Sequence, residues 1–250
     1  MKIAIITGGS RGLGKAMAIS VAAHGQDVIL TYQHNKQDAE AVVAQIEQSG
    51  RKAVALQLDV SDSTSFPAFR DAVKQALKQT WNRDTFNFLV NNAGIGIYAP
   101  LAEATEQQFD QLVNINLKGP LFLTQILLPL IEDGGRIINI SSGLARFSGP
   151  GYGIYGALKG SIEVLTRYMA TEFGSRHITA NVVAPGPIAT DFGGGAVRDN
   201  AAYNQALASR TALGRVGEAE DIGGVVASLL SDEMHWINGQ RIEASGGINL

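Results

Sequence analysis

The chain has 250 residues, of which 45% are hydrophobic, and its formal net charge is −3. This hydrophobic content supports a substantial core, and the slight negative charge provides no basic field that would attract nucleic acid or an anionic membrane. Because the chain has no cysteine, disulfides, thiolate metal sites and thiol nucleophiles are excluded, and its four histidines are too scattered to predict a metal site.

Short β-branched runs alternate with longer amphipathic segments along the whole chain. The predicted strands are Ile3–Thr7, Val28–Thr31, Ala53–Leu58, Phe86–Asn91, Arg136–Ser141, Ile178–Val183 and Gln240–Glu243. The predicted helices include Leu13–His24, Gln107–Ile131, Tyr152–Gly174 and one that Asn35 caps and that ends at Gly50. This alternation indicates right-handed βαβ units. No linker or repeat divides the chain, so we predict a single α/β domain over residues 1–250, with a doubly wound parallel sheet and helices on both faces.

The longest apolar stretch does not predict a membrane span. It runs from Pro120 to Ile131, is interrupted by Thr124 and Gln125, and is too short to cross a bilayer. We therefore expect a cytoplasmic protein that binds neither a membrane nor nucleic acid.

A glycine-rich turn, Thr7 to Gly14, leads from the first predicted strand into the first predicted helix. Small residues allow the backbone to approach a pyrophosphate closely, and the helix N-terminus favours its negative charge. The spacing is Gly-x-x-x-Gly-x-Gly, and such turns also occur for packing reasons. The strand–turn–helix context nevertheless favours a dinucleotide site.

The same turn also fits the nucleophile elbow of α/β-hydrolases, as Gly8-x-Ser10-x-Gly12. A hydrolase with Ser10 as nucleophile would need a downstream acid and histidine, for which Asp191 or Asp221 with His235 are candidates. The elbow would fall on the first strand, and no oxyanion-loop motif is present. A serine hydrolase is therefore a remote alternative.

Tyr155 and Lys159 are four residues apart in a predicted helix, which places both side chains on one face. A phenol has a pKa of about 10, and a nearby ammonium stabilises the phenolate; lowering the pKa to about 7 would take roughly 4 kcal/mol. The pair is thus a candidate acid/base device. Tyrosine and lysine at this spacing are also common on exposed helix faces, so the pair alone decides nothing.

Six motifs in order resemble the short-chain dehydrogenase/reductase family. They are Thr7-Gly8-x-x-x-Gly12-x-Gly14, Asn91-Asn92-Ala93-Gly94, Asn116, Ser142, Tyr155-x-x-x-Lys159 and Pro185-Gly186. The resemblance extends from Thr7 to Gly246-Gly247 and is strongest to NADP(H)-dependent 3-ketoacyl and carbonyl reductases. It implies a Rossmann-type seven-stranded sheet, hydride transfer between NADP(H) and a carbonyl or secondary alcohol, and commonly a homotetramer. A non-catalytic, regulatory dinucleotide-binding protein of this fold is the alternative, although such proteins commonly lose the tyrosine or lysine.

The resemblance also implies roles for individual residues. Tyr155 would be the general acid in reduction, Lys159 would lower its pKa and hold the nicotinamide ribose, and Ser142 would bind the substrate oxygen. Asn116 completes the catalytic set. The cofactor-binding residues would be Gly8, Ser10, Arg11, Gly12, Leu13, Gly14, Thr31, Asp59, Val60, Asn91, Ala93, Gly94, Tyr155, Lys159, Pro185, Gly186, Ile188 and Thr190. Within this set, Asn91 would brace the central strands.

Asn116 also permits an argument from the sequence itself. It lies four residues before Pro120, which has no N–H, so the Asn116 carbonyl loses its usual helical donor. A free carbonyl in a polar cleft would bind a water, and we predict that this water connects Lys159 to solvent. A plain proline kink is the alternative.

The residues after the second strand favour NADP(H) over NAD(H). NAD-binding proteins usually present an acid there to hold the ribose, whereas the stretch from Thr31 to Asn35 contains none. Arg11 is placed to pair with a 2′-phosphate, because a guanidinium suits phosphate geometry.

The segment at about residues 190–213 is a candidate substrate lid, because Gly193-Gly194-Gly195 suits a hinge. The pocket candidates are mostly apolar and comprise Ile95, Ile97, Leu144, Phe147, Tyr152, Phe192 and Val197. They favour a small-molecule ketone or alcohol with hydrophobic substituents. Glu132-Asp133 argues mildly against docking of an acidic carrier protein.

Overall fold

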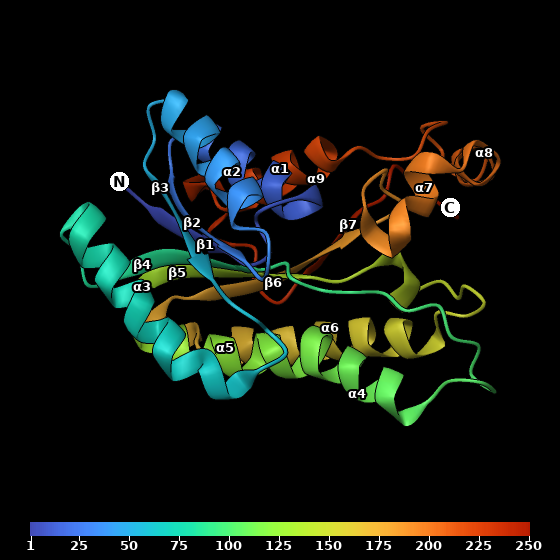
Figure 1. The fold of residues 1–250 in the computed structure, drawn as a ribbon, viewed down its shortest axis with the longest axis horizontal. Coiled ribbons are helices and arrows are strands. Elements are labelled where there is room, and N and C mark those ends of the chain that lie inside the picture. The colour runs from blue at the N-terminus through green and yellow to red at the C-terminus, as the bar shows by residue number, and fades with distance from the viewer.

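The structure is a computed structural model that describes residues 1–250, and a seven-stranded parallel sheet forms its centre (Figure 1). The strands are β1 (Ile3–Ile6), β2 (Asp27–Tyr32), β3 (Ala53–Gln57), β4 (Phe86–Asn91), β5 (Ile131–Ile140), β6 (Thr179–Pro185) and β7 (Arg241–Ala244). Their order across the sheet is β3-β2-β1-β4-β5-β6-β7, and every pairing is parallel. The predicted doubly wound, Rossmann-type sheet is therefore confirmed.

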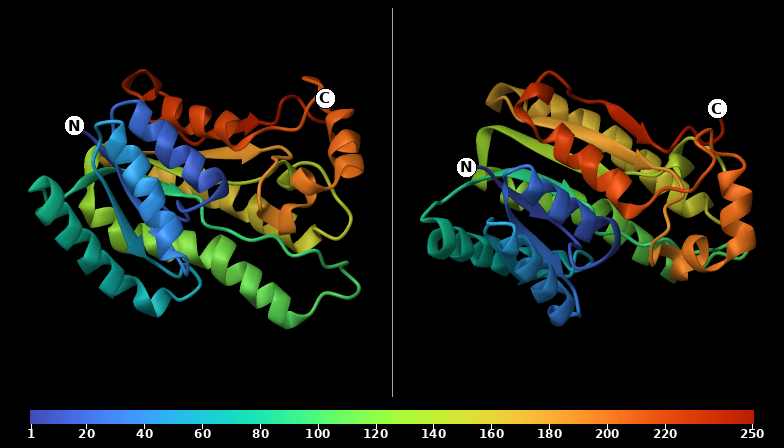
Figure 2. Two further views of the ribbon diagram at one scale, coloured as in Figure 1. Left: turned by 45° about the horizontal axis from the view of Figure 1, so that its top comes forward. Right: turned by 90° about the horizontal axis from the view of Figure 1, so that it is seen from above.

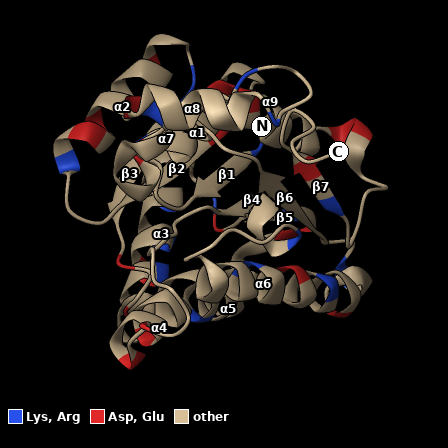
Figure 3. Ribbon diagram, turned by 90° about the vertical axis from the view of Figure 1, so that its right-hand side faces the viewer, with Lys and Arg blue, Asp and Glu red and all other residues tan.

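Helices cover both faces of the sheet (Figures 1 and 3). One layer contains α1 (Gly12–Ala23), α2 (Lys36–Gln48) and α9 (Ala219–Leu229), and the other contains α3 (Phe66–Trp81), α4 (Glu106–Val113), α5 (Gly119–Leu127) and α6 (Gly153–Glu172). Alternate strand residues feed the two cores: Leu30 packs in the cluster that includes Met17 of α1, whereas Ile29 packs in the cluster that includes Phe69 of α3. This explains why the central strands read as continuous apolar runs.

The predicted cap of α2 is present. The Asn35 side chain accepts a hydrogen bond from the backbone N–H of Asp38 at 3.2 Å, and this satisfies one of the free donors at the helix start. The helix ends at Gln48, just before Gly50, which adopts φ +83°.

The predicted continuous helix Gln107–Ile131 is wrong, because the segment consists of several pieces. A π-helical turn, Asn114–Lys118, separates α4 from α5, and the N–H of Gly119 donates to the Asn114 carbonyl across five residues. Pro120 has no N–H to continue an ordinary helical ladder, which accounts for a wider turn just before it. A short 3₁₀ turn, Leu128–Leu130, then ends the segment, and it contains a second proline.

Strand β5 begins earlier than the predicted Arg136. Ile131 pairs with Phe86, and the register then shifts before Arg136 pairs with Phe88. The intervening residues include Gly134 at φ +78°, a conformation that interrupts regular pairing. The first part of β5 therefore lacks the apolar pattern from which strands were predicted.

The functional end of the molecule is at the carboxyl ends of the strands, where β1 and β4 are neighbours although they are far apart in sequence. Strand order reverses there, and ligands of such sheets bind at this crevice. The short helices α7 (Ala196–Asp199) and α8 (Ala201–Ala208) gather at this end, beside the loops that follow β4 and β5 (Figures 1 and 2). None of the helices is both long and apolar enough to cross a membrane.

Candidate active site

A cleft of about 1070 Å³ opens at the carboxyl ends of the strands. It brings together most of the predicted site residues. Those that line it are Gly8, Ser10, Arg11, Gly12, Leu13, Thr31, Asp59, Val60, Ala93, Gly94, Ser142, Tyr155, Lys159, Pro185, Gly186, Ile188 and Thr190. Gly14, Asn91 and Asn116 do not line it.

The glycine turn is held by hydrogen bonds from neighbouring strands. The Thr31 hydroxyl accepts from the N–H of Gly8 at 3.1 Å, and the Thr7 hydroxyl accepts from the N–H groups of Asn92 and Ala93 at 2.9 Å each. These contacts join the loop after β1 to the end of β2 and to the loop after β4. The turn is therefore a fixed cradle at the start of α1 rather than a loose connection.

Gly14 and Asn91 support the cleft from behind. A Cβ atom at position 14 would lie 2.0 Å from the Gly8 carbonyl oxygen, so only glycine lets α1 approach the turn this closely. The Asn91 amide donates to Thr124 Oγ1 at 3.0 Å and to Asn139 Oδ1 at 2.8 Å. It thereby links β4 to β5 and α5, as the predicted bracing role requires.

The part of the cleft beyond β2 has a cation without an ion pair. Arg11 is exposed at the start of α1, and its guanidinium makes no hydrogen bond or salt bridge within the chain. Gln33, His34, Asn35 and Asp38 line the same part, and the Asn35 amide donates to the Asp38 carboxylate at 2.5 Å. A guanidinium beside a helix N-terminus suits an anionic group such as phosphate.

Tyr155 and Lys159 lie one turn apart on α6, as predicted, and both are buried, with 6% and 5% of their surfaces exposed. Lys159 Nζ donates to the Ile140 carbonyl at 2.9 Å and lies 5.6 Å from the centre of the Tyr155 ring. Ser142 lies two residues beyond the end of β5, and its hydroxyl accepts from the Leu144 N–H at 3.2 Å. The end of β5 thus places the serine and anchors the lysine.

Burial is the main cause of the pKa shifts of both Tyr155 and Lys159. It raises the pKa of Tyr155, and a hydrogen bond with the Ser142 hydroxyl only partly offsets it. Burial also lowers the pKa of Lys159 to about 8. Both shifts arise because a buried site disfavours the charged form. The predicted activation of Tyr155 by Lys159 stays a prediction.

Asn116 is buried beneath the cleft. Its amide nitrogen donates to the carbonyls of Ile95 and Leu112 at 3.0 and 3.1 Å, while its Oδ1 is buried without a hydrogen-bond partner. A Cβ atom at Gly94 would lie 2.9 Å from this Oδ1 and 3.5 Å from Lys159 Nζ. The Asn116 side chain and the lysine therefore approach the same glycine. The water relay through the Asn116 main-chain carbonyl stays a prediction.

The substrate end of the cleft is rich in aromatic side chains. Of the predicted pocket residues, Ile95, Leu144, Phe147, Tyr152, Phe192 and Val197 line it. Ile97 does not, and it packs instead against the small cluster of Leu112, Tyr155 and Leu158.

Several lining residues escaped the sequence analysis. They include Tyr98, Asn92, Ser141 and Asn249, whereas Asn200, Tyr203 and Arg210 belong to the predicted lid. Tyr98 follows Gly94 on the same loop, which is a usable signal. Asn249 reaches the cleft because the C-terminal segment folds back, and Arg210 donates to its Oδ1 at 2.7 Å. No local sequence pattern predicts this long-range contact.

The residues required for a serine hydrolase do not assemble. Asp191 pairs with Arg198, Asp221 pairs with Arg215, and the His235 ring bonds to the Asp232 carbonyl. No acid–histidine pair therefore reaches Ser10.

Known proteins resemble this chain over nearly its whole length. The model of a family described as enoyl-(acyl carrier protein) reductase matches residues 8–249. The tetrahydroxynaphthalene reductase of Pestalotiopsis fici is 35% identical, over 98% of this chain and 91% of its own. An uncharacterised oxidoreductase of Methylorubrum extorquens is 37% identical, over 99% of this chain and 97% of its own.

Solved structures extend the likeness to the whole fold. A promiscuous reductase that catalyses keto-reduction at C1 in lugdunomycin biosynthesis superposes with a TM-score of 0.94 at 38% identity, over 100% of this chain and 98% of its own. The landomycin C-6 ketoreductase, solved with NADP and rabelomycin, has a TM-score of 0.90 at 34% identity, over 99% and 96%. The chain belongs to the short-chain dehydrogenase/reductase family and is a hydride-transferring oxidoreductase.

Proposed function

We propose that this protein reduces ketones, or oxidises the corresponding secondary alcohols, with NADP(H) and with Tyr155 as the proton donor or acceptor. The observation that carries the proposal is the meeting of Tyr155, Lys159 and Ser142 in the same cleft as the glycine turn. Ketone-reducing relatives, one of them solved with NADP, support it.

The protein's part in reduction is to place the carbonyl and deliver a proton. NADPH, when bound, supplies the hydride to the carbonyl carbon. The Ser142 hydroxyl would donate a hydrogen bond to the substrate oxygen, and the Tyr155 hydroxyl would transfer its proton to that oxygen, leaving an alcohol and a phenolate. Because burial raises the pKa of Tyr155, the hydroxyl holds its proton at neutral pH and is ready to act as an acid.

The phenolate left by this step is unstable in a buried site and needs a nearby cation. Lys159 is the candidate, because its Nζ lies 5.6 Å from the Tyr155 ring. We propose that it stabilises the phenolate and holds the nicotinamide ribose. Reprotonation through a water on the Asn116 carbonyl is part of the same proposal.

The choice of NADP(H) is supported by Arg11. The cleft presents no acid directly after β2, where Thr31 to Asn35 line it, and the Arg11 guanidinium there has no partner within the chain. Two structures of angucycline or landomycin ketoreductases contain NADP, and a blue fluorescent protein with 38% identity contains NADPH.

We also propose that residues 190–213 act as a lid on the single domain of residues 1–250. The support is that Thr190, Phe192, Val197 and Tyr203 all line the cleft and belong to one continuous segment. Gly193 at φ +62° and its two following glycines provide hinge positions within it.

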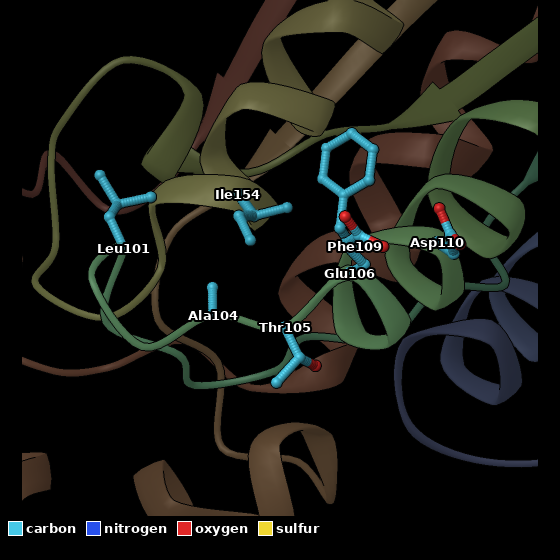
Figure 4. Close-up of a pocket in the computed structure, with 7 residues that line it drawn as sticks. All are labelled: Leu101, Ala104, Thr105, Glu106, Phe109, Asp110 and Ile154. Carbon is cyan, nitrogen blue, oxygen red and sulfur yellow. The ribbon is translucent and has the colours of Figure 1, made fainter.

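A homotetramer is the proposed assembly, because two separate apolar regions are exposed. One lies on α4, α5 and α6 and includes Phe109, Phe122, Val164 and Tyr168. A hollow of about 510 Å³ adjoins it, lined by Leu101, Phe109 and Ile154 among others (Figure 4). The second region is the one around Trp236, which is 90% exposed. Two distinct apolar regions suit the two interfaces of a tetramer. The cytoplasmic location expected from the sequence stays a prediction.

The test is NADPH oxidation with a panel of ketones, using Tyr155→Phe as the comparison. We expect the variant, which lacks only the hydroxyl, to lose activity by about 10²- to 10⁴-fold, the usual contribution of a positioned acid. Unchanged turnover in the variant would refute the role of Tyr155. NADPH binding without turnover of any ketone would favour the non-catalytic alternative.

A further inference from the structure

The Phe192 ring packs against the ring of Tyr155, the proposed proton donor. Its centre lies 5.8 Å from that of the Tyr155 ring, with the planes tilted by 49°. Phe192 remains 46% exposed, whereas Tyr155 is only 6% exposed. Both residues line the cleft, so the Phe192 ring shares the space in which a substrate carbonyl would meet the Tyr155 hydroxyl.

Gly96 forms the seat for this ring. A Cβ atom at position 96 would lie 2.8 Å from Phe192 Cζ and 2.9 Å from its Cε1. Real Cβ atoms do not approach ring atoms this closely, so the seat exists only because residue 96 has no side chain. The ring thus contacts the loop after β4 as well as α6.

The backbone next to Phe192 is suited to moving the ring. Gly193, Gly194 and Gly195 have φ values of +62°, +73° and +78°. A Cβ atom at Gly193 or Gly194 would meet nothing within 4 Å, so both positions border open space. Arg198 pairs with Asp191 across the three glycines, and this exposed ion pair is a weak restraint.

Two further tyrosine rings, those of Tyr152 and Tyr98, follow the Tyr155 ring along the cleft. The rings of Tyr155 and Tyr152 are 6.4 Å apart, and those of Tyr152 and Tyr98 are 5.7 Å apart, both edge to face. A flat aromatic ligand that displaces Phe192 therefore meets further rings, and it regains the aromatic contact that the displacement breaks.

We propose that Phe192 is a gate that determines specificity: it leaves its Gly96 seat to admit a ketone and then packs on the ketone's ring. The gate therefore selects flat, aromatic ketones over saturated ones of the same size. This inference rests on the proposed ketone reduction. It adds a specificity-determining residue and a substrate class to that proposal.

The experiment compares 1-tetralone with its saturated counterpart 1-decalone. Calorimetry with NADP⁺ present gives a dissociation constant for each ketone, so the readout does not depend on turnover. The variants are Phe192→Leu, which keeps an apolar side chain without an aromatic face, Phe192→Tyr, which keeps the face, and Gly96→Ala, which fills the seat. Gly224→Ala on α9 is the matched control, because a Cβ atom there meets nothing within 4 Å.

We expect the wild type to prefer 1-tetralone, and Phe192→Leu to reduce this preference by roughly two- to tenfold while Phe192→Tyr preserves it. Gly96→Ala should tighten binding of both ketones by a common factor, because the ring no longer competes from its seat. An unchanged preference in Phe192→Leu, or unchanged or weaker binding in Gly96→Ala, would overturn the gate. Binding with the expected preferences but no NADPH oxidation would refute the proposed reduction and leave the gate standing.

Discussion

Burial of Lys159 makes the stability of the protein depend on pH in a defined direction. Its pKa is lowered from 10.5 to about 8 by desolvation alone. Below pH 8 both the folded and the unfolded chain carry the ammonium, so the folded state bears the full cost of burying it. Between pH 8 and 10.5 only the unfolded chain keeps the proton, and stability therefore rises with pH across this window.

The size of this stability change follows from the pH range over which only the unfolded chain keeps the Lys159 proton. One pKa unit corresponds to about 1.4 kcal/mol, so the free energy of unfolding should rise by about 2 kcal/mol between pH 8 and 10 relative to Lys159→Met. The measurement stops near pH 10 because the phenol of Tyr155, whose pKa burial raises in the folded state, begins to titrate there in the unfolded chain of both proteins. Above pH 10 the unfolded chain loses a phenol proton that the folded chain keeps, and stability falls.

Urea unfolding of the wild type and Lys159→Met in steps from about pH 7 to 10 measures this difference. Both proteins are used at one concentration, and Lys74→Met, at an exposed lysine of α3, controls for general loss of a lysine. A constant difference between the wild type and Lys159→Met over the whole range would refute the reasoning, because it would mean that Lys159 titrates alike in both states.

Three further predictions concern the cofactor, the scaffold and the assembly. Arg11→Ala should raise KM for NADPH by about tenfold and leave KM for NADH nearly unchanged, since the guanidinium serves the extra phosphate; equal effects on both would contradict this. Asn91→Ala should lower the free energy of unfolding by about 1–3 kcal/mol, because it leaves the buried Asn139 Oδ1 without the Asn91 donor; the exposed Gln107→Ala is its control in urea unfolding. Trp236→Glu should reduce the mass measured by light scattering, and a wild-type mass equal to one chain would contradict the tetramer.

Sequence patterns predicted the parts of the fold that depend on neighbouring residues. Strands such as Ile3–Ile6 are short β-branched runs between turn signals, and Asn35 supplies a local cap. The glycine turn and the Tyr155–Lys159 pair were equally visible, because each depends on residue spacing within one segment.

The remaining features depend on contacts that no local pattern encodes. The π-helical turn at Asn114–Lys118 has ordinary helical sequence apart from the proline that follows it. Asn249 enters the cleft through the fold of the C-terminal segment. Ile97 looked like a pocket residue, yet it packs behind Tyr155, since a loop without regular period gives no indication of which side chains face inward.

Burial shifts both pKa values of the candidate site against the proposed phenolate–ammonium pair. Burial favours the neutral phenol of Tyr155 and weakens proton binding by Lys159, so desolvation acts against the phenolate–ammonium pair that proton transfer requires. With a pKa of about 8, however, Lys159 is still mostly protonated at neutral pH. In the proposed reaction, the site therefore holds a protonated Tyr155 hydroxyl and the Lys159 cation before the proton moves. A buried cation and a newly formed phenolate attract each other more strongly than they would in water, so the burial that opposes separate ionisation favours the pair once the proton has moved to the substrate.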